Sequence, residues 1–454
     1  MTDAPAAGPH VLRRAAGSPA LQAALIGLVM SAVAWLRLDN TTRGTVWAED
    51  GVIFLLERRT LGPWDSVFHV YAGYLQVGPR LLSNIAGVIA PVQLYAVTVT
   101  ALCCVVLGAI SSLVFLCTRD VVGSTLVRAA LASVTVLVPS GSIETMGNLA
   151  NLHWYALWLA PWLLLARPTR WRHAAVLGVV ALLAGLTEIQ VALFLPLVLF
   201  RLRDRRAWLV AVGLAAGVVA QVVATVSHPR PRPTDPVPGV VDIVKGFLLN
   251  VVVPLWTPSV DGPGRYFADH GWVVAVVMAL PFLVVGLGVV LVVGKASVRA
   301  RSLDPRAALV VALVLGAAVP FVAAVVLNPS LRLAYDSFTV EQLSGRLPLR
   351  YGLVPMMFLL ATALVWIDTR LDPRTTHGLR GRTAAGIVLV GVMALQLWHV
   401  APDGSRRSEG PGWNPGVEQA QAECRAGSAP TPVAAAPAAQ WAVPLDCDDL
   451  LNER

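Results

Sequence analysis

Long apolar runs recur along almost the whole of this 454-residue chain, and they constrain its fold more than any other feature. Most are roughly 17–25 residues long, which lets a helix cross about 30 Å of hydrocarbon. Because lipid offers no partner for backbone N–H and C=O groups, such runs must form helices. Hydrophobic residues make up 56% of the chain and charged residues only 14%, a balance unlike that of a soluble domain. The sequence therefore predicts an all-α fold, a polytopic bundle of transmembrane helices.

The apolar runs predict eleven crossings, and we expect the first to be a retained anchor because no small-residue cleavage site follows it. The fifth and sixth runs are short and are separated only by "LTEIQ". They are predicted to form either a helical hairpin that turns near the outer surface or a broken, re-entrant pair. The expected spans are residues 20–37, 92–117, 129–143, 150–166, 173–187, 189–200, 207–226, 272–294, 308–327, 351–369 and 383–400.

Basic residues gather in every second connection between these spans, in segments such as "RPTRWRH" and "RLRDRR". Short cytoplasmic loops are enriched in Arg and Lys, so this pattern, with Arg13 and Arg14 near the start, predicts a cytoplasmic N-terminus. An odd number of crossings then places the C-terminus outside. The net charge of +8 is interpreted as anchoring next to anionic membrane lipid rather than nucleic-acid binding. Arg is abundant and Lys is scarce, as in GC-rich bacteria, so we expect a bacterial plasma (inner) membrane.

The predicted topology divides the chain into a cytoplasmic tail (1–19), a transmembrane domain (20–400) and an extracytoplasmic tail (401–454). Three outer loops are long, and we expect helices in them that lie in the membrane interface; the first alternates apolar patches with aromatic residues. These loops cover residues 38–91, 227–271 and 328–350.

The C-terminal tail is rich in Pro, Ala and Gly, and it is expected to be loop-like and pinned at its end. It contains Cys424 and Cys447, and a disulfide can persist outside the cytoplasm. Sequence cannot show how far apart the two residues lie, so a bridge and two free thiols both stay open. Cys103, Cys104 and Cys117 fall within one apolar run, where free Cys behaves as a small hydrophobe.

The stretch "TVWAEDGVIFLL" places Glu49 and Asp50 side by side just outside the first span. One interpretation is a solvated helix start, since the helix dipole favours acids near an N-terminus. The other is a carboxylate fixed at the boundary between water and lipid, where the head group of a lipid-linked substrate lies. The first favours a structural role for the pair and the second a catalytic one.

Four segments carry a resemblance to a known family: "WAEDGVIFL", "YAGYLQVGPRLLSNIA", "GNLANLHWYALWLAPWLLL" and "GRLPLRYGLVPMM". With many crossings and an acidic motif in the first outer loop, the chain resembles the integral-membrane glycosyltransferases of the GT-C type. The resemblance implies transfer of a sugar, with inversion, from a polyprenyl-phosphate donor to an envelope glycan, glycolipid or protein acceptor on the outer face. A carboxylate would take the proton from the acceptor hydroxyl. Asp50 or Glu49 would be that base, with Asp50 preferred slightly.

A leaving phosphate needs cationic partners, and the fork of donors on Arg matches phosphate oxygens. Each outward-facing Arg could also simply reach lipid head groups. Glu144 and Glu188, near outer helix ends, are further functional candidates. A divalent cation, Mg or Mn, held by Asp50 and Glu144 is open, although no His and carboxylate spacing matches a dedicated metal site. The substrate-binding candidates are Tyr74, Arg80, Asn151, His153, Trp154, Arg346, Arg350 and Tyr351.

Three other classes of protein stay open. A transporter or lipid flippase would place polar residues near the bilayer midplane in broken helices, whereas the helices here are mostly Val, Leu, Ala and Gly. An envelope polymer ligase or polymerase would use outer arginines without an essential acid, so it should survive loss of the acid pair. A purely structural membrane subunit is the third.

Overall fold

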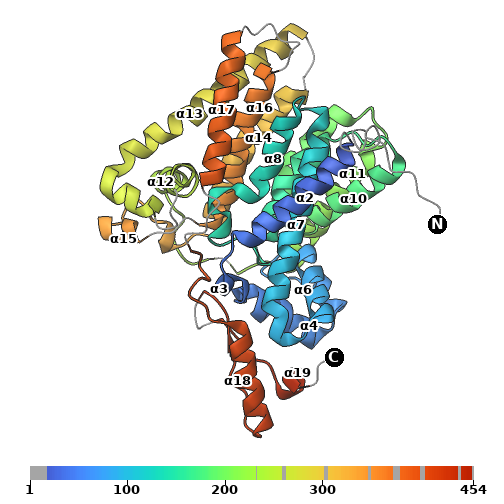
Figure 1. Ribbon diagram of the computed structural model, residues 1–454, viewed down its shortest axis with the longest axis vertical. Helices are drawn as coiled ribbons and strands as arrows, with labels where there is room; N and C mark the ends of the chain where they lie inside the picture. Colours follow the sequence, from blue (N-terminus) through green and yellow to red (C-terminus); the bar gives the residue numbers. More distant parts are fainter. Residues whose placement is uncertain are drawn as a thin grey trace, which may run out of the picture.

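The computed structural model describes residues 18–231, 233–257, 262–300, 305–345, 349–371, 379–398, 404–437 and 441–451. Helices dominate, and a two-stranded sheet near the C-terminus is the one sheet within these ranges. Figure 1 shows a bundle of long helices, with shorter helices and the C-terminal segment gathered at its lower end. The predicted all-α helical class is confirmed.

Seven helices in the described part of the chain are long and apolar enough to cross a membrane, judged by length and composition. Each overlaps one of the expected spans. They leave large apolar side chains such as Leu28, Val273 and Val284 exposed, as helices that face lipid do. The seven spans contain α2 (Pro19–Leu36), α7 (Tyr95–Cys117), α8 (Thr125–Leu137), α11 (Ala207–Ser227), α13 (Gly262–Ala300), α14 (Pro305–Leu327) and α16 (Leu353–Leu371). The span that contains α8 has 18 residues, because it continues to Ser142 through the 3₁₀ turn that follows the helix.

The other four expected spans form shorter apolar helices within the described residues. Length alone therefore does not give eleven crossings. The four are α9 (Leu152–Leu165), α10 (Trp171–Gly185), η5 (Ile189–Arg201) and α17 (Leu379–Trp398), of which Thr383–Trp398 is the apolar part.

The short pair α10 and η5 forms a hairpin. η5 is a 3₁₀ helix, which rises about 2.0 Å per residue, so its 13 residues extend about 26 Å. At its end Arg201 donates from Nε and Nη2 to the carbonyl of Leu165, at 2.9 and 2.6 Å. Because Leu165 precedes α10, η5 returns to the level at which α10 begins. The turn between them carries Glu188, whose side chain accepts from the N–H of Gln190 at 2.8 Å and so caps η5.

Helix α9 lies at the centre of the bundle, and nearly every residue of it is buried. Trp158 and Trp162 are fully buried, and Trp158 packs with its ring centroid 5.4 Å from that of Phe358 in α16. Phe358 in turn lies 5.4 Å from Phe194 of η5. This aromatic core fixes the start of α9, where several candidate site residues lie.

The loops predicted to hold interfacial helices are indeed largely helical. Short helices of the first loop lie at the lower end of the bundle in Figure 1, and we call this end the site end.

Short turns also flank α7 and precede α9 and α16. The first loop contains α3 (Asn40–Arg43), the π-helix η1 (Asp50–Leu55), α4 (Leu56–Leu61), α5 (Asp65–Phe68) and α6 (Val77–Ile89). The other loops contain α12 (Val240–Phe247), η6 (Leu248–Val252), η7 (Val253–Leu255), η8 (Leu331–Leu333) and α15 (Val340–Ser344). The turns are η2 (Val92–Leu94), η3 (Thr118–Asp120), η4 (Pro139–Ser142) and η9 (Arg350–Gly352).

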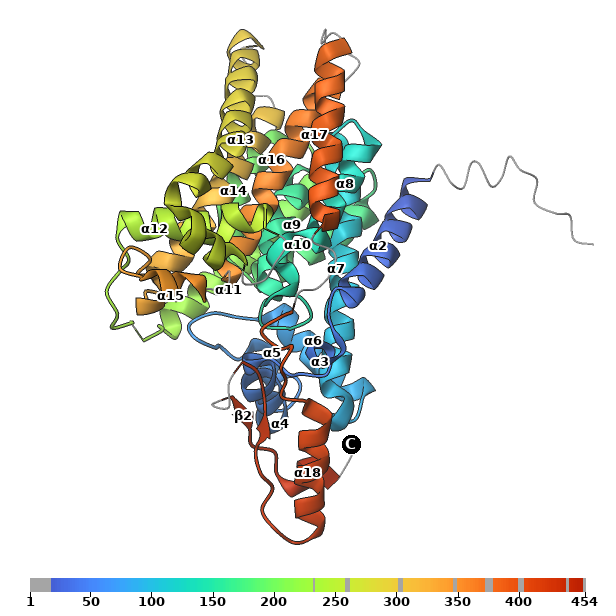
Figure 2. The ribbon, with the colours of Figure 1, turned by 60° about the vertical axis from the view of Figure 1, so that its left-hand side comes forward.

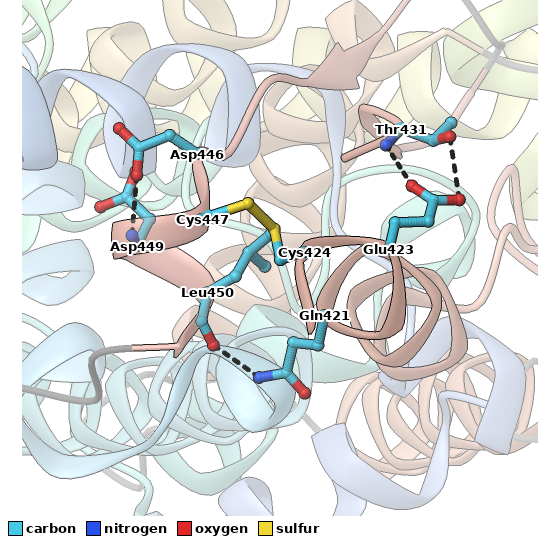
Figure 3. Close-up of a disulfide and its surroundings, with 8 residues drawn as sticks. All are labelled: Gln421, Glu423, Cys424, Thr431, Asp446, Cys447, Asp449 and Leu450. Carbon is cyan, nitrogen blue, oxygen red and sulfur yellow. Dashed lines mark hydrogen bonds between the residues drawn. A yellow bond between two sulfur atoms is a disulfide. The ribbon is translucent and has the colours of Figure 1, made fainter. Parts of the chain in front are cut away.

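The C-terminal tail is folded rather than loop-like, and its described residues 404–437 and 441–451 are called the cap. Cys424 and Cys447 are joined by a disulfide that ties the two cap helices together, which decides the alternative that the sequence left open. Figure 3 shows this bridge, with Gln421 donating to the carbonyl of Leu450 at 2.7 Å beside it. The cap consists of α18 (Trp413–Arg425), β1 (Val433–Ala434), the antiparallel β2 (Ala442–Val443), which pairs Val433 with Val443, and α19 (Cys447–Leu451).

The cap packs against the segment that carries the acid pair, as Figure 2 shows at the foot of the molecule. Ala436 bridges to Trp47: the N–H of Ala48 donates to the carbonyl of Ala436 at 2.7 Å, and the N–H of Ala436 donates to Val46 at 2.9 Å. The fully buried Trp413 donates from its indole to the carbonyl of Val92 at 2.7 Å. Two segments almost 400 residues apart in sequence therefore form one unit at the site end.

Candidate functional site

Asp50 is buried, and both of its carboxyl oxygens are occupied. Oδ2 accepts from the N–H of Leu149 at 2.8 Å and Oδ1 from that of Ala150 at 2.9 Å. Its backbone carbonyl accepts from the hydroxyl of Tyr95 at 3.1 Å. Burial raises the pKa of Asp50 to about 7, against the opposing effects of the two N–H donors and of Arg407. Asp50 therefore clamps the first loop onto the segment that leads into α9.

Arg407 of the cap binds the same segment, just before Leu149 and Ala150. It is 3% exposed and donates to the carbonyls of Met146 and Gly147, at 2.6 and 3.1 Å. Burial lowers its pKa, while the charge of Asp50 opposes that shift. Sequence reasoning missed Arg407 and its neighbour Arg406, although one signal was present: "SRRS" places two arginines in an extracytoplasmic tail, against the expected distribution of basic residues.

Glu49 has a different environment from its neighbour. It is half-buried, and its Oε2 is buried without a hydrogen-bond partner among the described residues. Its charge acts on Tyr71 and Tyr74: burial raises the pKa of Tyr71 to about 12 and Glu49 adds to that shift, and the pKa of Tyr74 is raised by the same two causes. Glu49, and not Asp50, therefore offers a free carboxylate oxygen.

The two tyrosines are presented by a tight turn. Tyr71 and Tyr74 exchange backbone hydrogen bonds at 3.1 Å in both directions, and their rings meet edge-on at 6.4 Å. Between them Ala72 and Gly73 have φ of 51° and 84°. Two consecutive positive φ values are typical of a type I′ turn, for which Gly is the least strained residue.

Glu144 joins two arginines from distant parts of the chain. Its Oε1 accepts from Nη1 of Arg350 at 2.9 Å, and its Oε2 lies 3.2 Å from Nε of Arg406 in the cap. The Glu144 side chain is 6% exposed, whereas that of Arg350 is 34% exposed. Arg350 is therefore fixed through its Nη1 donor, while part of its side chain stays accessible to a ligand.

Arg350 is positioned by a buried asparagine that the sequence did not single out. Asn250 of η6 accepts from the N–H of Leu349 at 2.7 Å and donates to the hydroxyl of Tyr335 at 3.0 Å. Gly352 lies directly against it: a Cβ on Gly352 would come within 2.0 Å of the Asn250 carbonyl. Asn250 therefore fixes the turn η9 from which Arg350 projects.

His153 and three aromatic or acidic neighbours complete the cluster. Nδ1 of His153 pairs with Oε2 of Glu188 at the turn of the α10–η5 hairpin. The ring of His153 lies 4.3 Å from that of Trp154, which meets Tyr351 edge-on at 6.1 Å. The indole N–H of Trp154 is buried without an acceptor in the described part of the chain. Trp154 is 3% exposed, so Tyr351 is the more accessible of the two rings.

The remaining predicted residues lie elsewhere or serve the backbone. Arg80 is buried, donates to Glu57 at 2.6 Å and lies 5.3 Å from the Phe54 ring, so it belongs to a separate pair in the first loop. Asn151 is buried and donates to Oδ1 of Asn148 from both its N–H and its side chain, at 3.0 and 2.8 Å. Arg346 lies outside the described residues.

An apolar groove of about 500 Å³ opens between α13, α16 and α17. Trp256 and Trp398 are among its lining residues, together with Phe282, Val285, Leu360 and Leu395. Helix α16 runs from the turn that holds Arg350 to Leu360, a rise of roughly 15 Å at 1.5 Å per residue. One helix therefore connects the groove with the charged cluster.

Among the described residues no three His, Cys, Asp or Glu side chains gather as a metal site would require. The pair considered for a divalent cation is already engaged. Asp50 accepts two backbone N–H groups and Glu144 faces two arginines.

Comparison with protein-family models, with curated proteins and with solved structures gave no match.

Proposed function

We propose that the protein is a GT-C-like membrane glycosyltransferase, which transfers a sugar from a polyprenyl-phosphate donor to an envelope glycan, glycolipid or protein acceptor. The observation that carries the proposal is the cluster at the site end. A carboxylate with a free oxygen on Glu49, a partly exposed Arg350 and the rings of Trp154 and Tyr351 come from three distant segments. These are the groups that proton removal, phosphate binding and sugar binding need.

Glu49 is the general base of this proposal, and Asp50 is a positioning residue. In a single displacement the acceptor hydroxyl gives its proton to Glu49 and its oxygen bonds to the anomeric carbon, while the bond from that carbon to the phosphate breaks on the opposite face. The anomeric configuration is thereby inverted. Both carboxyl oxygens of Asp50 accept backbone N–H groups, from Leu149 and Ala150, so we assign it to holding the first loop in place.

Arg350 holds the leaving phosphate, which keeps both electrons of the broken bond. A guanidinium matches phosphate oxygens with parallel donors, and Glu144 uses only one of the donors of Arg350. The groove lined by Trp256 and Trp398 takes the polyprenyl tail, since a chain of isoprene units needs an apolar wall. Because the apolar groove contacts only the tail of the donor, it cannot distinguish one sugar from another. The sugar would therefore be selected by residues near Trp154.

The proposal includes the predicted topology. The seven long helices and four shorter ones would make eleven crossings, with the N-terminus cytoplasmic and the cap extracytoplasmic, in a bacterial plasma membrane. η5 supports this count because a 3₁₀ helix of 13 residues spans about as far as 17 residues of α-helix.

The test is sugar transfer from radiolabelled polyprenyl-phosphate sugars by membranes that contain equal amounts of wild type, Glu49→Gln, Arg350→Ala or the control Glu418→Gln. Glu418 lies on the surface of the cap, where it accepts from Asn414. We expect Glu49→Gln to lose activity by about 10²–10⁴-fold, the range of general-base catalysis. Arg350→Ala should raise the KM for the donor, and Glu418→Gln should match wild type.

Transfer that survives Glu49→Gln would refute the catalytic role of the acid and favour the envelope ligase or polymerase. Absence of transfer by wild type from every donor tested would refute the glycosyltransferase itself.

A further inference from the structure

The end of the bundle opposite Glu188, which we call the basic end, has an open pocket of about 950 Å³. It lies between the start of α10 and the connection from η5 to α11. η5 separates it from the turn at Glu188 by roughly 26 Å, at about 2.0 Å per residue. The pocket is therefore independent of the candidate functional site.

The pocket carries an excess of positive charge. Its lining includes five arginines and one acid, Asp204. None of these arginines has a carboxylate within ion-pair distance in the part of the chain that the structure describes. Asp204 accepts with Oδ1 from the backbone N–H of Arg206 at 3.0 Å, and the charges of Asp120 and Asp204 act on Arg201 without forming an ion pair with it. The arginines are Arg167, Arg201, Arg203, Arg205 and Arg206.

Two of the arginines are held in place before any ligand binds. Arg201 is 3% exposed and is fixed by its two hydrogen bonds to the carbonyl of Leu165. The guanidinium of Arg206 lies over the ring of Trp171, 6.0 Å from its centroid. Arg203 and Arg205 are exposed and complete the rim. Arg201 also donates from Nη1 to the carbonyl of Phe200 at 3.5 Å, so it fixes the wall of the pocket, whereas Arg206 is a donor held in advance, which lowers the entropic cost of binding an anion.

The other wall of the pocket is apolar and open to the outside of the bundle. Leu199 is 64% exposed, Trp171 is 56% exposed and Leu202 is 46% exposed. A basic wall beside an exposed apolar wall matches an amphiphile, with a phosphate on one side and the start of an acyl chain on the other. A small soluble anion would make no use of the apolar wall.

We propose that this pocket binds an anionic phospholipid through its phosphate-bearing head group. Arg203 and Arg205 contact the head group, Arg206 and Trp171 flank it, and the acyl chains follow Leu199. The proposal goes beyond the proposed function and is independent of it, because the lipid is a ligand and takes no part in sugar transfer.

The experiment measures binding of short-chain phosphatidylglycerol to the purified full chain in a neutral detergent, with phosphatidylcholine and inorganic phosphate as separate probes. The pocket variant is Arg203→Gln with Arg205→Gln. The matched control is Arg170→Gln with Arg172→Gln, two exposed arginines beside the pocket that do not line it. Both variants remove two charges from the same end of the bundle.

We expect phosphatidylglycerol to bind more tightly than phosphatidylcholine. The pocket variant should weaken that binding by about 25-fold, since a basic residue near a membrane surface contributes roughly fivefold. The control should bind like wild type. Equal weakening in both variants would show diffuse surface charge and overturn the site. Equal binding of the two lipids would overturn head-group recognition, and inorganic phosphate binding as tightly as the lipid would reassign the pocket to a soluble anion.

Discussion

The two ends of the helix bundle hold their charges in opposite ways. At the site end Glu144 pairs with Arg350, 206 positions away, and with Arg406 of the cap. At the basic end five arginines lie within one stretch of about 40 residues, and their guanidinium groups form no ion pair among the described residues. The ion pairs of Glu144 form only once the chain has folded, whereas the arginines of the basic end are already close together in sequence. The site end should therefore be sensitive to single long-range links, and the basic end should not.

The largest expected effect concerns the Asp50 clamp. Since the pKa of Asp50 is raised from 3.8 to about 7 by burial, the folded protein keeps a proton that the unfolded chain releases. The free energy of unfolding should therefore fall as pH rises from about 4 to about 7, by on the order of 4 kcal/mol from this group. Asp50→Asn cannot ionise and should flatten that dependence. Thermal unfolding of both proteins in detergent across this pH range measures it, and identical slopes would contradict it.

The next effect concerns the disulfide of the cap. Cys424 and Cys447 close a loop with a sequence separation of 23, which should stabilise the cap by about 3 kcal/mol. Replacing both with Ser should loosen the cap from Val46–Ala48 and speed its limited proteolysis, while leaving the basic end unchanged. Ser428→Ala, an exposed change in the same loop, is the control. Unaltered proteolysis would show that the contacts between the cap and the first loop hold the cap in place without the disulfide.

A smaller effect is expected at Asn250. Asn250→Ala removes the hydrogen bond to Tyr335 and leaves the N–H of Leu349 without its buried acceptor, which should cost about 2 kcal/mol. Thermal unfolding measures that cost, and Asn414→Ala on the surface of α18 is the control. If Asn250 positions Arg350, the same variant should also raise the KM for the donor. Lost stability with an unchanged KM would limit Asn250 to a structural role.

The smallest effect tests the basic end. Arg203→Gln removes an exposed charge without an acidic partner in the described ranges, so the free energy of unfolding should change by less than about 0.5 kcal/mol. The same unfolding experiment in lipid-free detergent measures it. A loss well above that value would show that charges also hold the basic end together.

Much of the helical architecture could be predicted because apolar length is a local property. The shape of η5 could not be predicted in this way: Pro196 lacks an N–H, and the apolar pattern does not distinguish a 3₁₀ helix from an α-helix. The cap was predicted to be loop-like because it contains few large apolar residues. Trp413 and Val417 nevertheless become fully buried, and Trp413 does so against a loop near Val92 that no local pattern connects to it.

The site was predicted in part for the same reason. The sequence places Glu49 and Asp50 together, but it gives no reason for either acid to be the one that meets the N–H groups of Leu149 and Ala150. Neighbouring residues on a helix point in different directions, and packing against a segment 99 residues away engages one and leaves the other free. Arg406 was missed because its partner Glu144 is recognisable only in three dimensions.

The sequence alone determined that this is a helical membrane protein and where its acids and arginines stand along the chain. Transfer of apolar side chains from water to lipid adds up residue by residue, so it can be summed from composition and length. Packing in three dimensions engages the Asp50 carboxylate, leaves an oxygen of Glu49 free and brings the cap to the site. A buried charge depends on the few groups within hydrogen-bond reach, and here those groups come from segments hundreds of residues apart.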